Sequence, residues 1–82
     1  MNMVIKIKNA QYQGDYKIIL NFTDGKEISV DFEGFLKSAR NPMTKKYRDF
    51  NKFKNFEIVY GDLIWNDYEM CFPIWDLYKG KI

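Results

Sequence analysis

The chain has 82 residues, of which 46% are hydrophobic, 18% aromatic and 29% charged. Because single domains usually hold roughly 100 to 150 residues, we expect residues 1–82 to form one domain. Lys and Arg exceed Asp and Glu by only 13 to 11, which argues against a dedicated polyanion binder. Histidine is absent and the one cysteine is Cys71, so His-based catalysis and most metal or thiol sites are excluded, and no cofactor is expected.

The sequence indicates a protein of the reducing cytoplasm. A single cysteine cannot form an internal disulfide, and no secretory leader pattern is present. The longest apolar runs are triplets, whereas a membrane helix needs about 20 apolar residues, so no membrane span is expected.

The first third of the chain shows apolar residues at every second position, which predicts strands with one buried face. Gly14 and Gly25 stand in the intervening turns, where hairpins need a positive φ. We therefore expect a three-stranded antiparallel meander. The inward positions are Met3, Ile5, Ile7, Tyr16, Ile18, Leu20, Phe22, Ile28, Val30 and Phe32.

Helical spacing replaces this alternation after Phe32. A short helix is expected around residues 35–39, followed by an amphipathic helix that begins at Asn41-Pro42 and extends to Phe53. Its apolar side is made by Met43, Tyr47, Phe50 and Phe53.

From Phe56 to Trp65 the alternation typical of strands returns, and it predicts a hairpin with its turn at Gly61-Asp62. A short strand or turn at residues 70–72 and a helical turn from Ile74 to Tyr78 follow Trp65. The expected fold is α+β: an antiparallel sheet of about five strands in the order βββ-α-ββ, with one or two short helices and a short C-terminal helical turn.

Several segments follow one another in a characteristic order: residues 16–20, Phe22-x-Asp24-Gly25, Val30-Asp31-Phe32, the helical insert ending at Phe53, Ile64-Trp65, and Pro73 with Leu77-Tyr78. Together these segments resemble the bacterial family called domain of unknown function 2442. The likeness covers residues 4–79, and the chain departs from the usual family pattern after Trp65, where it has Asn66-Asp67-Tyr68-Glu69-Met70.

This resemblance implies an antiparallel α+β fold, and it brings no catalytic residues with it. Some relatives carry an appended helix-turn-helix domain. Family genes often lie beside those of a second small uncharacterised family, in arrangements like toxin and antitoxin pairs, which implies a small protein partner.

The carboxylates offer the only candidates for acid or base catalysis in a chain without histidine. Most of them fall in predicted turns, where Asp accepts backbone hydrogen bonds, so structural roles are favoured over a small hydrolase. Cys71 lies between Met70 and Phe72 and is expected to be a small buried thiol. The candidate carboxylates are Asp24, Asp31, Glu33, Asp62, Asp67 and Glu69.

Residues 37–54 carry seven cationic side chains against one carboxylate, Asp49. Three interpretations remain open: a solvated helix face, a nucleic-acid footprint, and a patch for an acidic protein. The candidate basic patch is Lys45, Lys46, Arg48 and Lys52.

Three apolar residues, Ile19, Val59 and Ile64, have the opposite strand parity to the predicted core. On a single sheet they would form an exposed strip, which usually marks an interface, unless a helix covers them or they lie at the margin of the sheet. The function expected from the sequence is a non-enzymatic protein-interaction module, antitoxin-like, binding a small protein or its own copy. The alternative is a weak nucleic-acid binder using residues 37–54.

Overall fold

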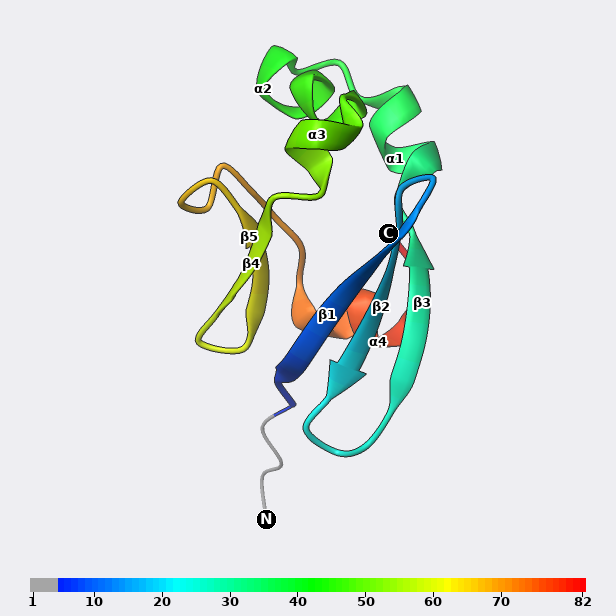
Figure 1. Ribbon diagram of the computed structural model, residues 1–82, viewed down its shortest axis with the longest axis vertical. Helices are drawn as coiled ribbons and strands as arrows, with labels where there is room; N and C mark the ends of the chain where they lie inside the picture. Colours follow the sequence, from blue (N-terminus) through cyan, green and yellow to red (C-terminus); the bar gives the residue numbers. More distant parts are fainter. Residues whose placement is uncertain (1–4) are drawn as a thin grey trace.

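The computed structural model describes residues 5–82 and shows an α+β fold with two three-stranded antiparallel sheets. The first sheet is the predicted meander, with strands β1 (Ile7–Gly14), β2 (Lys17–Phe22) and β3 (Glu27–Asp31) in that order (Figure 1). Gly14 (φ +91°) and Gly25 (φ +94°) take the positive φ that the turns require. Met3, the expected first inward residue, lies outside the described residues.

The second sheet consists of β4 (Phe56–Val59), β5 (Asp62–Trp65) and β6 (Met70–Cys71), again in chain order. The prediction of one five-stranded sheet is therefore wrong. Register shifts interrupt the β1–β2 pairing at residues 7–9 and 12–14, and such bulges twist a strand away from regular pairing. The two sheets are joined at one end of β1, where Ile7 N donates to Gly61 O at 2.9 Å.

The helical insert between the two sheets begins with α1 (Glu33–Ser38) and continues as three short pieces. The expected single helix from Asn41 to Phe53 is wrong, because Asp49 is extended (φ −74°, ψ 119°) and its side chain accepts a hydrogen bond from Asn51 N. Asp competes in this way with the continuing helix and caps the next one. The pieces are α2 (Pro42–Lys45), η1 (Lys46–Arg48) and α3 (Phe50–Phe53).

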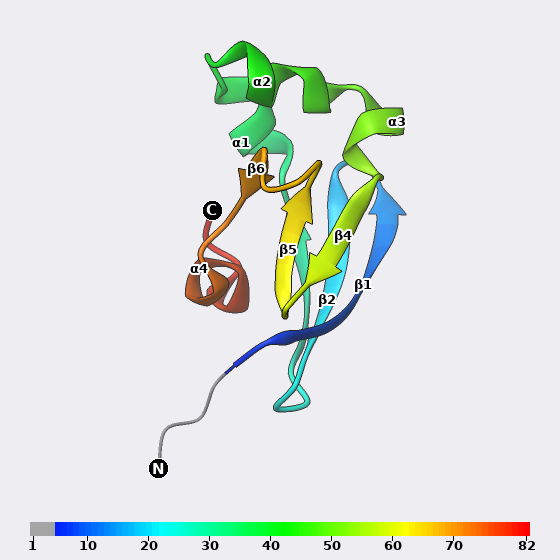
Figure 2. The same cartoon turned by 90° about the vertical axis from the view of Figure 1, so that its left-hand side faces the viewer.

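Both sheets contribute side chains to one core, with the helical insert at one end and α4 (Ile74–Lys79) alongside (Figure 2). Trp65 is fully buried, and its indole N–H donates to Phe53 O at 2.6 Å. Its ring lies 5.5 Å from that of Phe53 and 5.7 Å from that of Phe32, so this one side chain ties β5 to the insert and to the end of β3. The expected C-terminal helical turn is present as α4.

None of the helices within residues 5–82 has the length and hydrophobicity needed to cross a membrane.

Candidate functional site: a polar hollow and two exposed tyrosines

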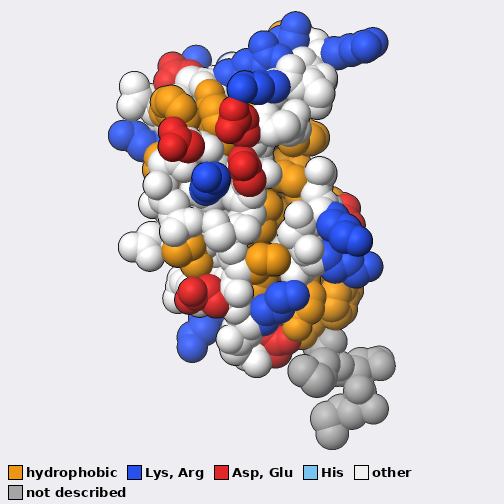
Figure 3. Space-filling model, turned by 90° about the vertical axis from the view of Figure 1, so that its right-hand side faces the viewer, with side chains coloured by type: hydrophobic (Ala, Val, Ile, Leu, Met, Phe, Trp, Pro, Cys, Tyr) orange, Lys and Arg blue, Asp and Glu red, His pale blue; other side chains and the backbone are white. Residues whose placement is uncertain are grey.

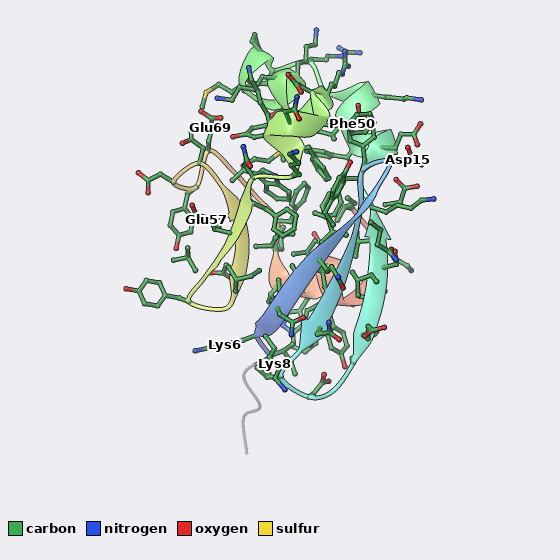
Figure 4. The ribbon with its side chains drawn as sticks, viewed as in Figure 1. Lys6, Lys8, Asp15, Phe50, Glu57 and Glu69 are labelled. Carbon is green, nitrogen blue, oxygen red and sulfur yellow. The ribbon has the colours of Figure 1, made fainter. Side chains whose placement is uncertain are left out.

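A polar hollow of about 370 Å³ lies between the helical insert and the second sheet. It is lined by two lysines, a carboxylate, two amides and a tyrosine. Figure 4 shows Glu57, on β4, and Glu69, beyond β5, on the same side of the molecule. The lining residues are Lys46, Tyr47, Lys52, Asn55, Glu57 and Asn66.

One wall of the hollow is a fixed network around Glu69. Lys46 Nζ forms an ion pair with Glu69 Oε1, and Tyr47 Oη donates to the same oxygen at 2.6 Å. Asn66 Nδ2 donates to Glu69 Oε2 at 3.3 Å. Because three donors stabilise the carboxylate, we expect this wall to be held in one arrangement.

The network shifts two pKa values in opposite directions. The hydrogen bond from Lys46, followed by the one from Tyr47, lowers the pKa of Glu69, so this carboxylate stays ionised at neutral pH. Burial, followed by the hydrogen bond to Glu69, raises the pKa of Tyr47 to about 12. Neither group is tuned for proton transfer near pH 7.

The other wall carries groups that are open to solvent. Lys52 and Glu57 are exposed, and within residues 5–82 neither forms an ion pair. Asn55 stands next to them in the turn between α3 and β4. This wall is therefore available to charged and hydrogen-bonding groups of a ligand or partner.

Two exposed tyrosines lie at opposite ends of β5. Tyr60 is 88% exposed and Tyr68 is 48% exposed. Both have left-handed backbones, with φ +52° and +66°, a conformation that is uncommon for bulky residues and costs of order 1 kcal/mol or more. We call Tyr60, Tyr68 and the lining of the hollow the tyrosine face.

Most of the tyrosine face was not identified from the sequence. Tyr60, Tyr68, Asn55 and Glu57 were not among the predicted site residues. The available signal was the hairpin turn, which lies at Tyr60-Gly61 and not at the predicted Gly61-Asp62, because Asp62 pairs with Val59 as the first residue of β5. This two-residue turn has an aromatic residue where Asn or Asp is usual. A ring in that position is not needed for the turn, and it cannot reach a core.

The predicted basic patch is divided between several roles. Lys46 and Lys52 line the hollow, and Lys45 is exposed on α2. Arg48 instead serves the fold, since its Nε donates to Leu36 O at 2.8 Å and its Nη2 to Lys37 O at 2.8 Å. These carbonyls belong to the last turn of α1, where Leu36 O also accepts from Ala39 N at 3.3 Å.

The predicted apolar strip is not assembled. Ile19 lies on β2 in the first sheet, whereas Val59 and Ile64 lie on β4 and β5 in the second. Ile64 has the expected outward parity and pairs with Glu57 and Cys71, but it is only 2% exposed. The expectation that Ile64 is exposed is therefore wrong, because a central strand position is flanked by side chains on both sides. Ile19 and Val59 are partly buried.

Cys71 is exposed, which corrects the expectation of a buried thiol. In the two-residue strand β6, Met70 points into the core and is 5% exposed, so the next residue points outward.

The motif residues that suggested the family have structural roles. Asp24 Oδ1 accepts from Lys26 N at 3.0 Å and its Oδ2 accepts from Tyr78 Oη at 2.5 Å, and this second bond is the main cause of the lowered pKa of Asp24. Asp31 Oδ1 accepts from Glu33 N at 2.9 Å, at the start of α1. Phe22 and Leu77 are buried. Among residues 5–82, no cluster of three or more acidic or Cys side chains could hold a metal ion.

The fold and site define a small α+β protein with a polar hollow beside its second sheet. The chain matches the family model described as protein of unknown function (DUF2442) over residues 7–82, and it belongs to this family. No curated protein and no solved structure matches the chain.

Proposed function

We propose that this chain is a non-enzymatic protein-interaction module that docks a small protein through the tyrosine face. The observation that carries the proposal is the pair Tyr60 and Tyr68, which are held exposed on left-handed backbones at either end of β5. Strained, exposed aromatic residues are retained where function requires them, and Tyr is enriched among the residues that dominate binding energy at protein interfaces.

The polar hollow between the helical insert and the second sheet suits a polar rim. Lys52 can pair with a carboxylate of the partner, and Glu57 and the amides of Asn55 and Asn66 can exchange hydrogen bonds with it. The fixed network around Glu69 supplies a rigid wall, which reduces the entropy lost on binding. An antitoxin-like role, in which the chain restrains a small partner protein, is the most concrete form of this proposal, and a second copy of the chain is the other possible occupant.

Two features argue against the competing functions. Glu69 is held ionised by Lys46 and Tyr47, so it is poorly suited to act as a general acid. For nucleic-acid binding, Arg48 is engaged with α1 and Lys46 with Glu69, which leaves Lys45 and Lys52 of the predicted patch for phosphate contacts.

The test is capture of partners from the native host with tagged chain, in dilute buffer and at about 0.5 M salt. The variant Tyr60→Ser/Tyr68→Ser removes both exposed rings. Trp75→Ser is the matched control, because Trp75 is 51% exposed on α4 and is not part of the tyrosine face. Light scattering of each purified chain distinguishes self-association from a different partner.

We expect a stoichiometric protein that survives high salt, is retained by Trp75→Ser and is lost with the double Tyr variant. A nucleic acid that dissociates at high salt would replace this proposal with the alternative function. Retention of the partner by the double Tyr variant would contradict docking through this face.

A further inference from the structure

The outer edge of β3 is the one regular, open strand edge in the described part of the chain. The β2–β3 pairing continues from residue 17 opposite 31 to residue 21 opposite 27 without a bulge. The edge of β1 is irregular, β4 packs beside β1, and β6 has only two residues. In Figure 1, no element lies beside β3 on its open side.

The backbone of β3 offers hydrogen-bonding groups along this edge. Two bonds flank the β2–β3 ladder, from Phe22 N to Lys26 O at 2.8 Å and from Phe32 N to Tyr16 O at 2.9 Å. Because hydrogen-bonded pairs alternate in an antiparallel ladder, the even-numbered residues of β3 bond to β2 and the odd-numbered residues direct N–H and C=O outward. The outward groups belong to Glu27, Ser29 and Asp31.

Most of the usual protection of such an edge is missing from β3. Natural edge strands are blunted by Pro, bulges, charged side chains or inward-pointing charges, since an open ladder otherwise recruits another strand. The charges on β3 are the two carboxylates at its ends, Glu27 and Asp31. The inward residues of β3 are Ile28 and Val30, both apolar, and the strand contains no Pro or Lys. The edge is therefore competent to pair with an incoming strand.

An apolar surface continues beyond the inner side of β3. Ile28 lies against Gly80, the C-cap of α4, and the ring of Phe35, in the first turn of α1, lies 4.9 Å from that of Phe72. All three side chains are only partly buried. Figure 3, which faces this side, shows hydrophobic side chains in a line down the surface with acidic side chains beside it.

Charge specifies the incoming strand. Glu27 and Asp31 are exposed at the two ends of β3, and within residues 5–82 neither forms an ion pair. A second copy pairing symmetrically about Ser29 would place Glu27 opposite Asp31 of its partner, which is repulsive. Lysine or arginine at these two positions of another protein would be attracted instead.

We propose that the β3 edge is a second docking surface, which binds an extended, basic segment of a partner protein by strand addition. Residues opposite Glu27 and Asp31 share their outer face and are Lys or Arg, while residues opposite Ile28 and Val30 face inward and are apolar. The recognised pattern is basic, apolar, small polar, apolar, basic. This surface is separate from the tyrosine face and does not depend on it.

The test is titration of the full chain with a peptide whose central five residues are Lys-Ile-Thr-Val-Lys, followed by NMR and by amide hydrogen exchange. We expect the amides of Glu27, Ser29 and Asp31 to shift and to become protected at peptide concentrations up to about 1 mM. A peptide with Glu at both ends should bind at least about tenfold more weakly, and salt should reduce the difference.

Ser29→Pro removes one outward N–H, which an edge strand tolerates because that group faces solvent. Ser29→Ala is its matched control, since both variants lose the hydrogen bond from Ser29 Oγ to Gln13 but only the proline loses the backbone donor. We expect Ser29→Pro to abolish the protection of the Glu27 and Asp31 amides by the peptide, and Ser29→Ala to keep it.

Absence of any shift at β3, equal binding of the acidic peptide, or undiminished protection in folded Ser29→Pro would each overturn the proposal. Shifts confined to residues of the hollow would also overturn it. Tyr60→Ser/Tyr68→Ser should leave peptide binding unchanged, so this test and the test of the tyrosine face can fail independently.

Discussion

Arg48 shows how a residue predicted to bind a partner can be committed to the fold. Its guanidinium donates to the carbonyls of Leu36 and Lys37 and so closes the end of α1. We expect Arg48→Ala to lower the free energy of unfolding by about 1 to 3 kcal/mol, because these two carbonyls lose a charged hydrogen-bond donor. Urea denaturation measures the change, and Lys45→Ala, at an exposed position, should stay within about 0.5 kcal/mol of wild type.

Tyr47 and Glu69 give the hollow a signature in alkaline titration. The pKa of Tyr47 in the folded chain is about 12, above its ordinary value of 10.0, so its contribution to stability is complete below pH 10 and is lost as pH rises toward 12. Tyr78 also has a raised pKa, because its hydroxyl donates to Asp24, so the titration is made in a Tyr78→Phe background. There, ultraviolet titration of tyrosinate should show a late phase that a further Tyr47→Phe removes and a further Tyr60→Phe retains. A late phase that persists in Tyr78→Phe/Tyr47→Phe would contradict the network.

The stability contributed by Glu69 has the opposite pH dependence to that contributed by Tyr47. Its folded pKa is lowered, so the stabilisation is present at neutral pH and is lost as pH falls from the ordinary value of 4.5 through the lowered one. We expect Glu69→Gln to be less stable than wild type at pH 7, and the two to converge on acidification below pH 4.5. Parallel urea midpoints across that range would contradict this.

At the scale of elements, the alternation and turn residues were enough to predict five of the six strands, the meander and the final helix. Hydrophobic parity also sets Ile64 apart from Leu63 and Trp65, which belong to the core cluster, although it does not predict that Ile64 is buried. It does not predict the division into two sheets, because parity fixes which side a residue faces and not which strands pair. Nor does it predict the break at Asp49, where a side-chain cap competes with an apolar pattern that fits a longer helix.

The junction between the sheets can be tested with a pair of glycines. Gly61 and Gly14 both have positive φ, so alanine at either position costs about 1 kcal/mol. A Cβ at Gly61 would also lie 2.6 Å from Lys6 Cβ, whereas a Cβ at Gly14 would meet nothing within 4 Å. We expect Gly61→Ala to be the more destabilising by about 1 to 3 kcal/mol in urea. Equal effects would show that Lys6 does not pack there.

For the whole molecule, the two sheets share one core through Trp65, so we expect them to unfold together. Trp65 is buried and Trp75 is half exposed. In the variant Trp75→Phe, Trp65 is the remaining tryptophan, so the tryptophan fluorescence of this variant reports on the core. Its unfolding curve should coincide with the far-ultraviolet circular dichroism curve of the same variant. Separate midpoints would show that the sheets are independent.

The candidate site was less predictable than the fold because binding residues carry no periodic signal. Lys46 and Lys52 were identified from charge density, but the same signal included Arg48, whose role depends on where α1 ends. Tyr60 and Tyr68 become candidates only once their exposure is known. A tyrosine in a strand-rich sequence otherwise suggests core.

The most direct test of the central claim, that a protein docks on the tyrosine face, is hydrogen exchange of the captured complex against the chain alone. We expect protection in two segments, residues 57–64 and 66–69, with little change in the basic residues 37–45. Protection confined to residues 37–45, or none at either end of β5, would contradict docking through this face.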